Sequence, residues 1–355
     1  MPEGYFHRVT RQTPTRFWVN NPTIEDAKRA IAAGAISCTT NPTFCSRMLK
    51  VSAESDYALS VVDGVVQQTA DDDAAADLVQ QHLVKRVMEE FLPLYEHRPG
   101  AEGFVSIQGD PHSDEDPDHV VEEALRFRKL AKNFITKIPC TDAGLRAIEF
   151  MIGENMPIIA TEVFAIAQVV ETCAVYRRVS EKTGRRPPFY VTHISGIFDE
   201  YLAGVVKREG IGISPRVLSQ AGCAVARKQY RIMRERCYPG VMLGGGARGT
   251  HHFTEMVGGA IHLTINWNTA EELLDSDPPV VPRIGAETPG SIIDELCYKL
   301  PDFRRAFLEE GLAREDFKDY GPLQYFRSMF VQGWDVLLRN IRERRQRSSA
   351  YASSV

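Results

Sequence analysis

The chain has 355 residues, of which 43% are hydrophobic and 25% charged, and its formal net charge is −5. This balance is typical of a globular protein and is far from the composition of a disordered chain or a membrane protein. No uncharged apolar stretch approaches the roughly 20 residues of a membrane helix. The one Arg-rich stretch, 339–347, is interpreted as a solvated helix end. We therefore expect neither a membrane nor a nucleic-acid partner, whereas a homo-oligomer is compatible with the composition.

The seven cysteines are scattered, odd in number and never spaced C-x-x-C. This pattern predicts neither a disulfide framework nor a zinc site. The first sixteen residues have no apolar core, so no secretory signal is expected. Reduced thiols and a cytoplasmic location are the simplest interpretation.

Short apolar runs alternate with longer helical patterns along most of the chain. Eight runs, rich in β-branched residues, suit parallel strands buried on both faces. They lie at 17–20, 36–41, 103–108, 133–139, 157–162, 189–195, 240–244 and 261–266.

Helical patterns fill the intervals between these strands. Thr23 is expected to cap a helix, with Asp26 three residues later. An apolar stripe follows residues 77–92, and another runs from Phe326 to Ile341. Ser214 and Pro215 predict the start of one helix that runs towards residue 236.

Eight strands with intervening helices favour a single (β/α)8 TIM barrel, the α/β class. An open doubly wound sheet is the alternative, but it usually has a Gly-rich turn after its first strand, where this chain reads NNPTIED. We expect an N-terminal extension at 1–15, the barrel at 16–275, C-terminal helices packed on it at 276–345, and a disordered tail at 346–355.

Reactive side chains at the carboxyl ends of the strands decide what such a barrel can do. Lys137 ends the fourth strand, where burial would favour its neutral, nucleophilic form. From position alone it could equally reach into solvent. Thr161, Gln108 and Asn20 also close strands and could orient a water molecule or a substrate hydroxyl.

A glycine run at 244–249 follows the seventh strand. Its exposed amides and a helix expected to begin near Thr250 could bind an anion, with Gly245 and Arg248 as contacts. A flexible turn would need the same glycines. His251 and His252 are adjacent and should diverge, so no metal site is expected there.

Five segments in family order resemble transaldolases and the related fructose-6-phosphate aldolases. They are TTNPTF (39–44), VSIQGDP (105–111), ITKIPCTDAGLRAI (135–148), IIATEVFAIAQV (158–169) and AIHLTINW (260–267).

The resemblance implies a class I aldolase or transaldolase, which needs no cofactor. Lys137 falls on the Schiff-base lysine, and Thr161 on the threonine that binds the catalytic water. Gln108 stands where transaldolases have glutamate and the fructose-6-phosphate aldolases have glutamine. Asn41 falls on the asparagine that contacts the substrate, and Thr40 precedes it in the same motif.

The departures from the family pattern concern protons and phosphate. The first-strand aspartate is replaced by Asn20, or by Asn21 after a one-residue shift, and an amide cannot exchange a proton as a carboxylate does. The sixth strand reads THISGI (192–197), so the phosphate-binding arginine becomes Ile197. The serine and the basic residue that the family has after the seventh strand are missing, and Arg248 stands one position after the place of that basic residue.

We therefore expect a divergent Schiff-base enzyme of cytoplasmic carbohydrate metabolism, related to the pentose phosphate enzymes, that cleaves, makes or transfers a dihydroxyacetone-type unit. His193 and Ser195 are further candidates for substrate contact. His193, Asp110 and Glu162 are candidates to replace the missing carboxylate. A barrel without catalysis, serving as a binding or scaffold protein, is the alternative. A metal-dependent aldolase lacks a suitable His/Asp/Glu cluster at the strand ends.

Overall fold

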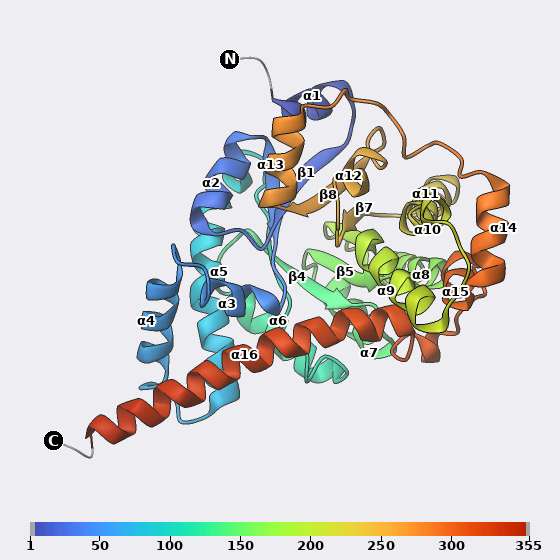
Figure 1. The fold of residues 1–355 in the computed structure, drawn as a ribbon. Coiled ribbons are helices and arrows are strands. Elements are labelled where there is room, and N and C mark those ends of the chain that lie inside the picture. Colours follow the sequence, from blue (N-terminus) through green and yellow to red (C-terminus); the bar gives the residue numbers. More distant parts are fainter. Residues whose placement is uncertain (1–3, 353–355) are drawn as a thin grey trace.

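The eight strands of the computed structural model form a closed parallel barrel in which each strand pairs with its sequence neighbours and β8 pairs with β1 (Figure 1). The structure describes residues 4–352, with side-chain surroundings up to residue 347. The strands are β1 (Arg16–Asn20), β2 (Ala35–Thr39), β3 (Val105–Ile107), β4 (Phe134–Pro139), β5 (Ile158–Val163), β6 (Phe189–Ile194), β7 (Val241–Gly245) and β8 (Ile261–Asn266). The predicted (β/α)8 barrel is confirmed, and all eight predicted strands overlap the observed ones.

Side-chain alternation divides each strand between the barrel interior and the surrounding helices. The interior holds a cluster of buried side chains from successive strands. It consists of Trp18, Phe104, Ile135, Ile159, Tyr190 and Leu243. The residue two positions later on each strand must also point inward, one layer nearer the carboxyl end. This layer forms the floor of the site described below.

The helices cover the outside of the barrel and close its carboxyl end. Up to β6 they are α1 (Tyr5–Gln12), α2 (Ile24–Ala32), α3 (Thr43–Met48), α4 (Ser55–Val65), α5 (Asp72–His97), α6 (Pro117–Phe127), α7 (Asp142–Gly153) and α8 (Ile166–Thr183). After β6 come α9 (Ser195–Glu209), α10 (Pro215–Leu218), α11 (Ala221–Glu235), α12 (His251–Thr254), α13 (Trp267–Ser276), α14 (Gly290–Lys299), α15 (Pro301–Phe307), the 3₁₀ turn η1 (Arg314–Asp316) and α16 (Gly321–Ala352).

Local signals explain several helix boundaries. Thr23 and Asp26 form the predicted capping box of α2. The predicted helix from Ser214 is wrong in one respect, because it is split into α10 and α11. Gly222, near the start of α11, donates its N–H to Asp199 Oδ1 at 2.7 Å, and its carbonyl is bound by His193 Nε2 at 2.9 Å. These tertiary bonds fix a separate helix start.

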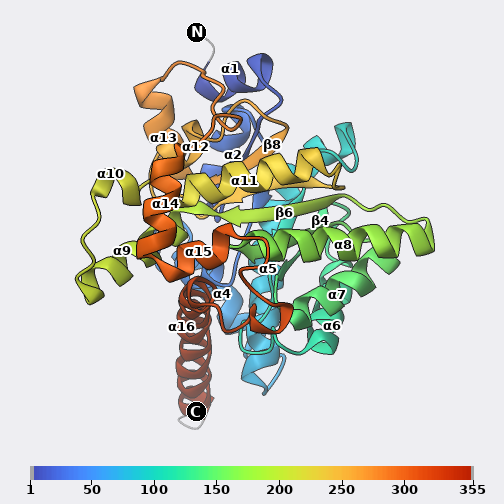
Figure 2. The same cartoon turned by 90° about the vertical axis from the view of Figure 1, so that its right-hand side faces the viewer.

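The C-terminal helix α16 crosses the carboxyl end of the barrel, as its red ribbon shows in Figure 1, and packs against α3, α4, α5 and α9. In Figure 2, α15 lies beside α11, and α14 packs on α10 and α15. α16 continues to Ala352, into the segment 346–355 that the sequence analysis predicts as a disordered tail. No proline or glycine interrupts residues 334–352. Residues 353–355 lie outside the described part of the chain.

The N-terminal segment predicted as an extension packs on the barrel through α1. The Phe6 ring stacks on Phe17 of β1 with 4.0 Å between centroids. The seven cysteines are free, five of them buried. Among the described residues, none of the helices combines the length and apolar character needed to cross a membrane.

Candidate active site at the carboxyl end of the barrel

A cavity of about 400 Å³ opens at the carboxyl ends of the strands, where barrels of this kind carry their sites. Its floor is the layer of residues that follows the interior cluster by two positions. These residues are Asn20, Lys137, Thr161, Thr192 and Gly245, with Thr39, Thr264 and Asn266 from β2 and β8 beside them. Strand periodicity alone therefore brings Lys137 and Thr161 together.

Lys137 is the one lysine among the described residues that line this cavity. It is 8% exposed, and its Nζ lies 3.4 Å from the Thr40 carbonyl and 5.7 Å from the centre of the Phe330 ring. Burial lowers the pKa of Lys137 from 10.5 to about 8, partly opposed by the negative charge of Glu162. At neutral pH the neutral amine is then roughly 300-fold more abundant than for an ordinary lysine.

Amide and hydroxyl groups form one wall of the cavity. Asn20 Nδ2 donates to Asn266 Oδ1 at 2.9 Å, and Thr39 Oγ1 donates to Asn20 Oδ1 at 2.9 Å. Asn21 Nδ2 donates to Asn41 Oδ1 at 3.0 Å. Both Asn20 and Asn21 line the cavity, so either can contact a bound molecule. The wall suits a ligand with several hydroxyl groups.

The opposite wall is apolar and comes from two distant parts of the chain. Ile194 is the last residue of β6 and Ile197 lies in the first turn of α9, whereas α16 contributes Phe326, Met329 and Phe330. Of the apolar wall, the sequence identified only Ile197, as the replacement of a family arginine. The α16 contribution gave no sequence signal as a site, because its apolar stripe is also what packing requires.

The glycine run forms the rim between β7 and α12. Gly245, Gly246 and Arg248 line the cavity. Gly246 needs to be glycine, because its φ is +67° and a Cβ there would lie 2.6 Å from Ile194 Cγ2. The helix predicted near Thr250 is only one turn, α12, and the Arg248 guanidinium is paired with Glu200. The predicted anion site therefore lacks a long helix whose N-terminus could attract an anion, and its arginine is already paired with a carboxylate.

Three predicted contact residues do not line the cavity with their side chains. Thr40 Oγ1 donates to the Ser106 carbonyl, and Thr40 reaches Lys137 only through its own carbonyl. His193 is fully buried against α11, and burial lowers its pKa to about 4. Ser195 begins α9 and is buried there. Strand alternation explains why His193 points away from the cavity, because its neighbours Thr192 and Ile194 are the residues that line it.

Gln108 also lies outside the residues that line the cavity. Its Nε2 donates to Glu162 Oε1 at 2.8 Å, directly behind the floor. Thr161 does line the cavity, and no described residue bonds its hydroxyl. The Thr161 hydroxyl is thus available to a ligand, whereas the Gln108 amide nitrogen already donates to Glu162.

Several cavity residues were missed from the sequence. The clearest is Arg47 of α3, whose guanidinium lines the cavity while donating to the Asn21 carbonyl at 2.5 Å and lying 3.4 Å from Asp26 Oδ2. Its position one helical turn beyond the Asn41-Pro42 turn could have indicated it. Asn266 could have been found as the last residue of the eighth strand.

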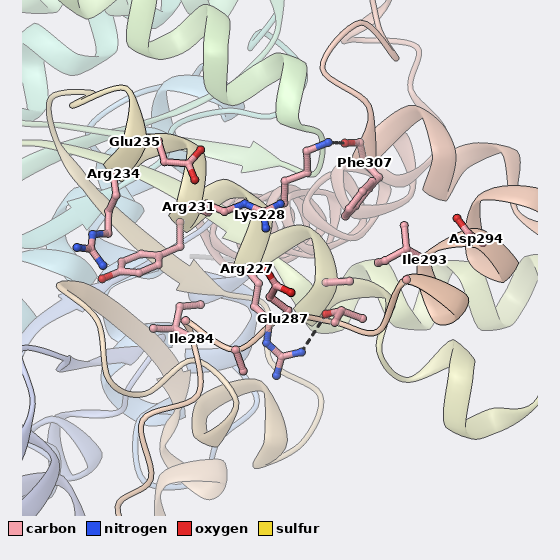
Figure 3. Close-up of a pocket in the computed structure, with 16 residues that line it drawn as sticks. Arg227, Lys228, Arg231, Arg234, Glu235, Ile284, Glu287, Ile293, Asp294 and Phe307 are labelled. Atoms are coloured by element: carbon pink, nitrogen blue, oxygen red, sulfur yellow. Dashed lines mark hydrogen bonds between the residues drawn. The ribbon is translucent and has the colours of Figure 1, made fainter.

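A larger cavity of about 620 Å³ lies away from the strand ends, between α11, α15 and the 284–294 segment (Figure 3). Its basic side chains are partly committed to the protein. Arg227 pairs with Glu255 and bonds Thr288, and Lys228 donates to the Phe307 carbonyl at 2.6 Å. Acidic residues, Glu235, Glu287 and Asp294, share the lining. The buried Lys137 lines the smaller cavity and not this one.

His251 and His252 do not diverge as expected, because their ring centres are 3.9 Å apart. With Asp199 they bring three potential ligand atoms within 4.8 Å of one another. Asp199 Oδ2 already binds His252 Nε2 at 3.0 Å, and the N–H of Arg248 donates to His252 Nδ1. The side chains of Asp199 and His252 therefore have structural partners within the protein.

The fold is a (β/α)8 barrel, and a cavity at the carboxyl ends of its strands holds a buried lysine among polar side chains. Residues 17–314 match the family Transaldolase/Fructose-6-phosphate aldolase, and the chain belongs to this family. It is 26% identical over 212 residues to the transaldolases of Mycobacterium tuberculosis (strain ATCC 25618 / H37Rv), Mycobacterium marinum and Mycolicibacterium paratuberculosis. The alignment covers 56% of this chain and 55% of each relative, so the chain spans about half the length of the curated relatives it matches.

Proposed function

We propose that the protein is a transaldolase-like Schiff-base enzyme in which Lys137 forms an imine with a ketose-type substrate. One observation carries the proposal. Lys137 lies buried at the floor of the strand-end cavity, where burial lowers the pKa of its ammonium to about 8. Such a lysine has a nucleophilic fraction at neutral pH without the help of a metal or cofactor.

The reaction follows from the chemistry of an amine and a ketone. The neutral Nζ attacks the ketone carbon, and the carbinolamine loses water to give an iminium ion. The iminium accepts the electron pair of the neighbouring C–C bond as the adjacent hydroxyl loses its proton and an aldehyde leaves. The resulting enamine is either protonated on carbon, which corresponds to cleavage, or attacks another aldehyde carbon, which corresponds to transfer. In both cases water then hydrolyses the iminium, which releases the ketone product and restores the Lys137 amine.

The amide wall favours a substrate with several hydroxyl groups, and the apolar wall favours a substrate end that carries no phosphate. The amide wall around Asn20, Asn41 and Asn266 offers donors and acceptors to hydroxyl groups. The two cavity arginines are engaged: Arg248 pairs with Glu200, and Arg47 binds Asn21 and Asp26. A phosphate would have to displace one of these contacts and would face the apolar side chain of Ile197.

Borohydride reduction tests the imine. Incubating the protein with dihydroxyacetone or fructose and borohydride should add one reduced substrate mass to the intact chain. Lys137→Met puts an unbranched apolar side chain, one atom shorter, in place of the amine and should give no adduct. An adduct of equal yield in Lys137→Met would contradict the proposal, and no adduct in the natural chain with any ketose would favour the scaffold alternative.

A further inference from the structure

Glu162 occupies an irregular position in the strand that carries Thr161. β5 has one more residue than β6 at this point, because Ala160 pairs with Val191 and Val163 pairs with His193. Glu162 has a φ of +58°, a conformation that residues other than glycine rarely adopt. Bulges of this kind redirect side chains and are frequent next to active sites.

The bulge places a carboxyl group in the protein interior with one oxygen unused. Glu162 is fully buried. Its Oε1 accepts the Gln108 amide at 2.8 Å, while no described residue bonds its Oε2. A buried carboxyl without full hydrogen bonding is costly, so a packing role alone does not account for it.

The titratable groups around Glu162 come from four parts of the chain. Lys137 on β4 and Arg327 on α16 are positive, Asp114 in the loop after β3 is negative, and Cys140 follows β4. Asp114 is itself paired with Arg327 at 2.8 Å. Two titratable groups oppose the effect of burial on the pKa of Lys137, the carboxyl of Glu162 and, more weakly, the thiol of Cys38 on β2.

The other candidate groups from the sequence cannot supply a negative charge beside Lys137. Asn20 and Gln108 are amides, which neither carry a charge nor exchange a proton near neutrality. His193 is bonded to Gly222 on the far side of β6. Asp110 bonds the His112 and Ser113 segment, outside the cavity lining. Glu162 remains as the acidic partner of the lysine.

We propose that Glu162 is a positioning residue that controls the proton occupancy of Lys137 through its charge and orients Gln108 through its hydrogen bond. The inference rests on the proposed function in that Lys137 is the reacting group. Burial raises the pKa of Glu162 to about 8, so a small change in its surroundings changes its charge in the working pH range of the lysine.

Two variants separate the charge from the hydrogen bond. Glu162→Gln keeps an acceptor for Gln108 and removes the charge, whereas Glu162→Met removes both. Glu123→Gln is the matched control, because Glu123 is a 5% exposed carboxyl on α6 that accepts the Asp110 N–H and lies outside the cavity. A cooperative thermal unfolding transition is the check that each variant is folded.

The readout is the pH dependence of Lys137 acetylation by acetic anhydride, followed on the Lys137 peptide by mass spectrometry and requiring no substrate. Removing the negative charge should lower the midpoint by about half a pH unit or more in both Glu162 variants. Glu123→Gln should leave it unchanged. In turnover, Glu162→Met should lose roughly tenfold more kcat than Glu162→Gln, with KM little altered.

An unchanged acetylation midpoint in Glu162→Gln, or an equal shift in Glu123→Gln, would overturn the charge role. Equal kcat in Glu162→Gln and Glu162→Met would overturn the role in orienting Gln108. A shifted midpoint in a protein that forms no borohydride adduct would leave Glu162 as the partner of Lys137 and remove only the proposed imine chemistry.

Discussion

Replacing Lys137 with methionine should stabilise the folded protein at neutral pH. Burial lowers the pKa of this lysine from 10.5 to about 8, so the fold disfavours the ammonium form. At 1.36 kcal/mol per pH unit, the cost is at most about 3.4 kcal/mol. The lost contacts, a 3.4 Å bond to the Thr40 carbonyl and a ring contact with Phe330, offset about 1 kcal/mol. The expected gain is therefore about 2 kcal/mol.

The pH dependence gives the sign of this effect. The folded pKa of Lys137 is lower than the unfolded value, so the penalty is complete below about pH 8 and disappears as the pH rises towards 10.5. Urea unfolding at pH 7 and at pH 10 should show a large advantage for Lys137→Met at pH 7 and a smaller one at pH 10. Lys132→Met, at a side chain that is 78% exposed, is the control and should have little effect at either pH.

A Lys137→Met protein that is less stable than the natural chain at pH 7 would refute the reasoning. So would a difference of the same size at both pH values, because it would show that apolar packing and not relief of a buried charge is responsible.

Three further perturbations test the site. His193→Ala should leave the pH profile of adduct formation unchanged above pH 6, because the pKa of His193 is lowered to about 4 and its ring faces α11; a displaced profile would return His193 to proton handling. Phe330→Ala should admit water to Lys137, raise its pKa and slow adduct formation at pH 7 roughly tenfold, and an unchanged rate would contradict the role of burial. Arg248→Ala should change KM for a neutral ketose less than about threefold, because Arg248 is held by Glu200; a steep KM increase for a sugar phosphate, with competition by inorganic phosphate, would show that the arginine binds phosphate instead.

The barrel was predictable because its strands are buried on both faces and therefore appear as continuous apolar runs. The same periodicity identified the inward-facing floor, since Lys137 follows Ile135 and Thr161 follows Ile159 by two residues. Thr23 and Asp26 gave the start of α2 through a purely local capping box.

The rest depended on tertiary structure. The wall from α16 lies far along the chain from the barrel, and an apolar stripe does not show what it covers. The bulge at Glu162 is a backbone conformation without a residue signature, because glutamate is not a residue that favours positive φ. It also engages Gln108, which the sequence had placed in the cavity. The break between α10 and α11 depends on bonds to Gly222 from β6 and α9.

The most direct test of the Schiff-base proposal is the location of the borohydride adduct by peptide mapping. Reduction should block tryptic cleavage after Lys137 and yield a peptide of residues 133–146 that carries one substrate mass, with fragment ions that place the added mass on Lys137. An adduct on any other lysine, with residues 133–137 released unmodified, would contradict the proposed chemistry of this site.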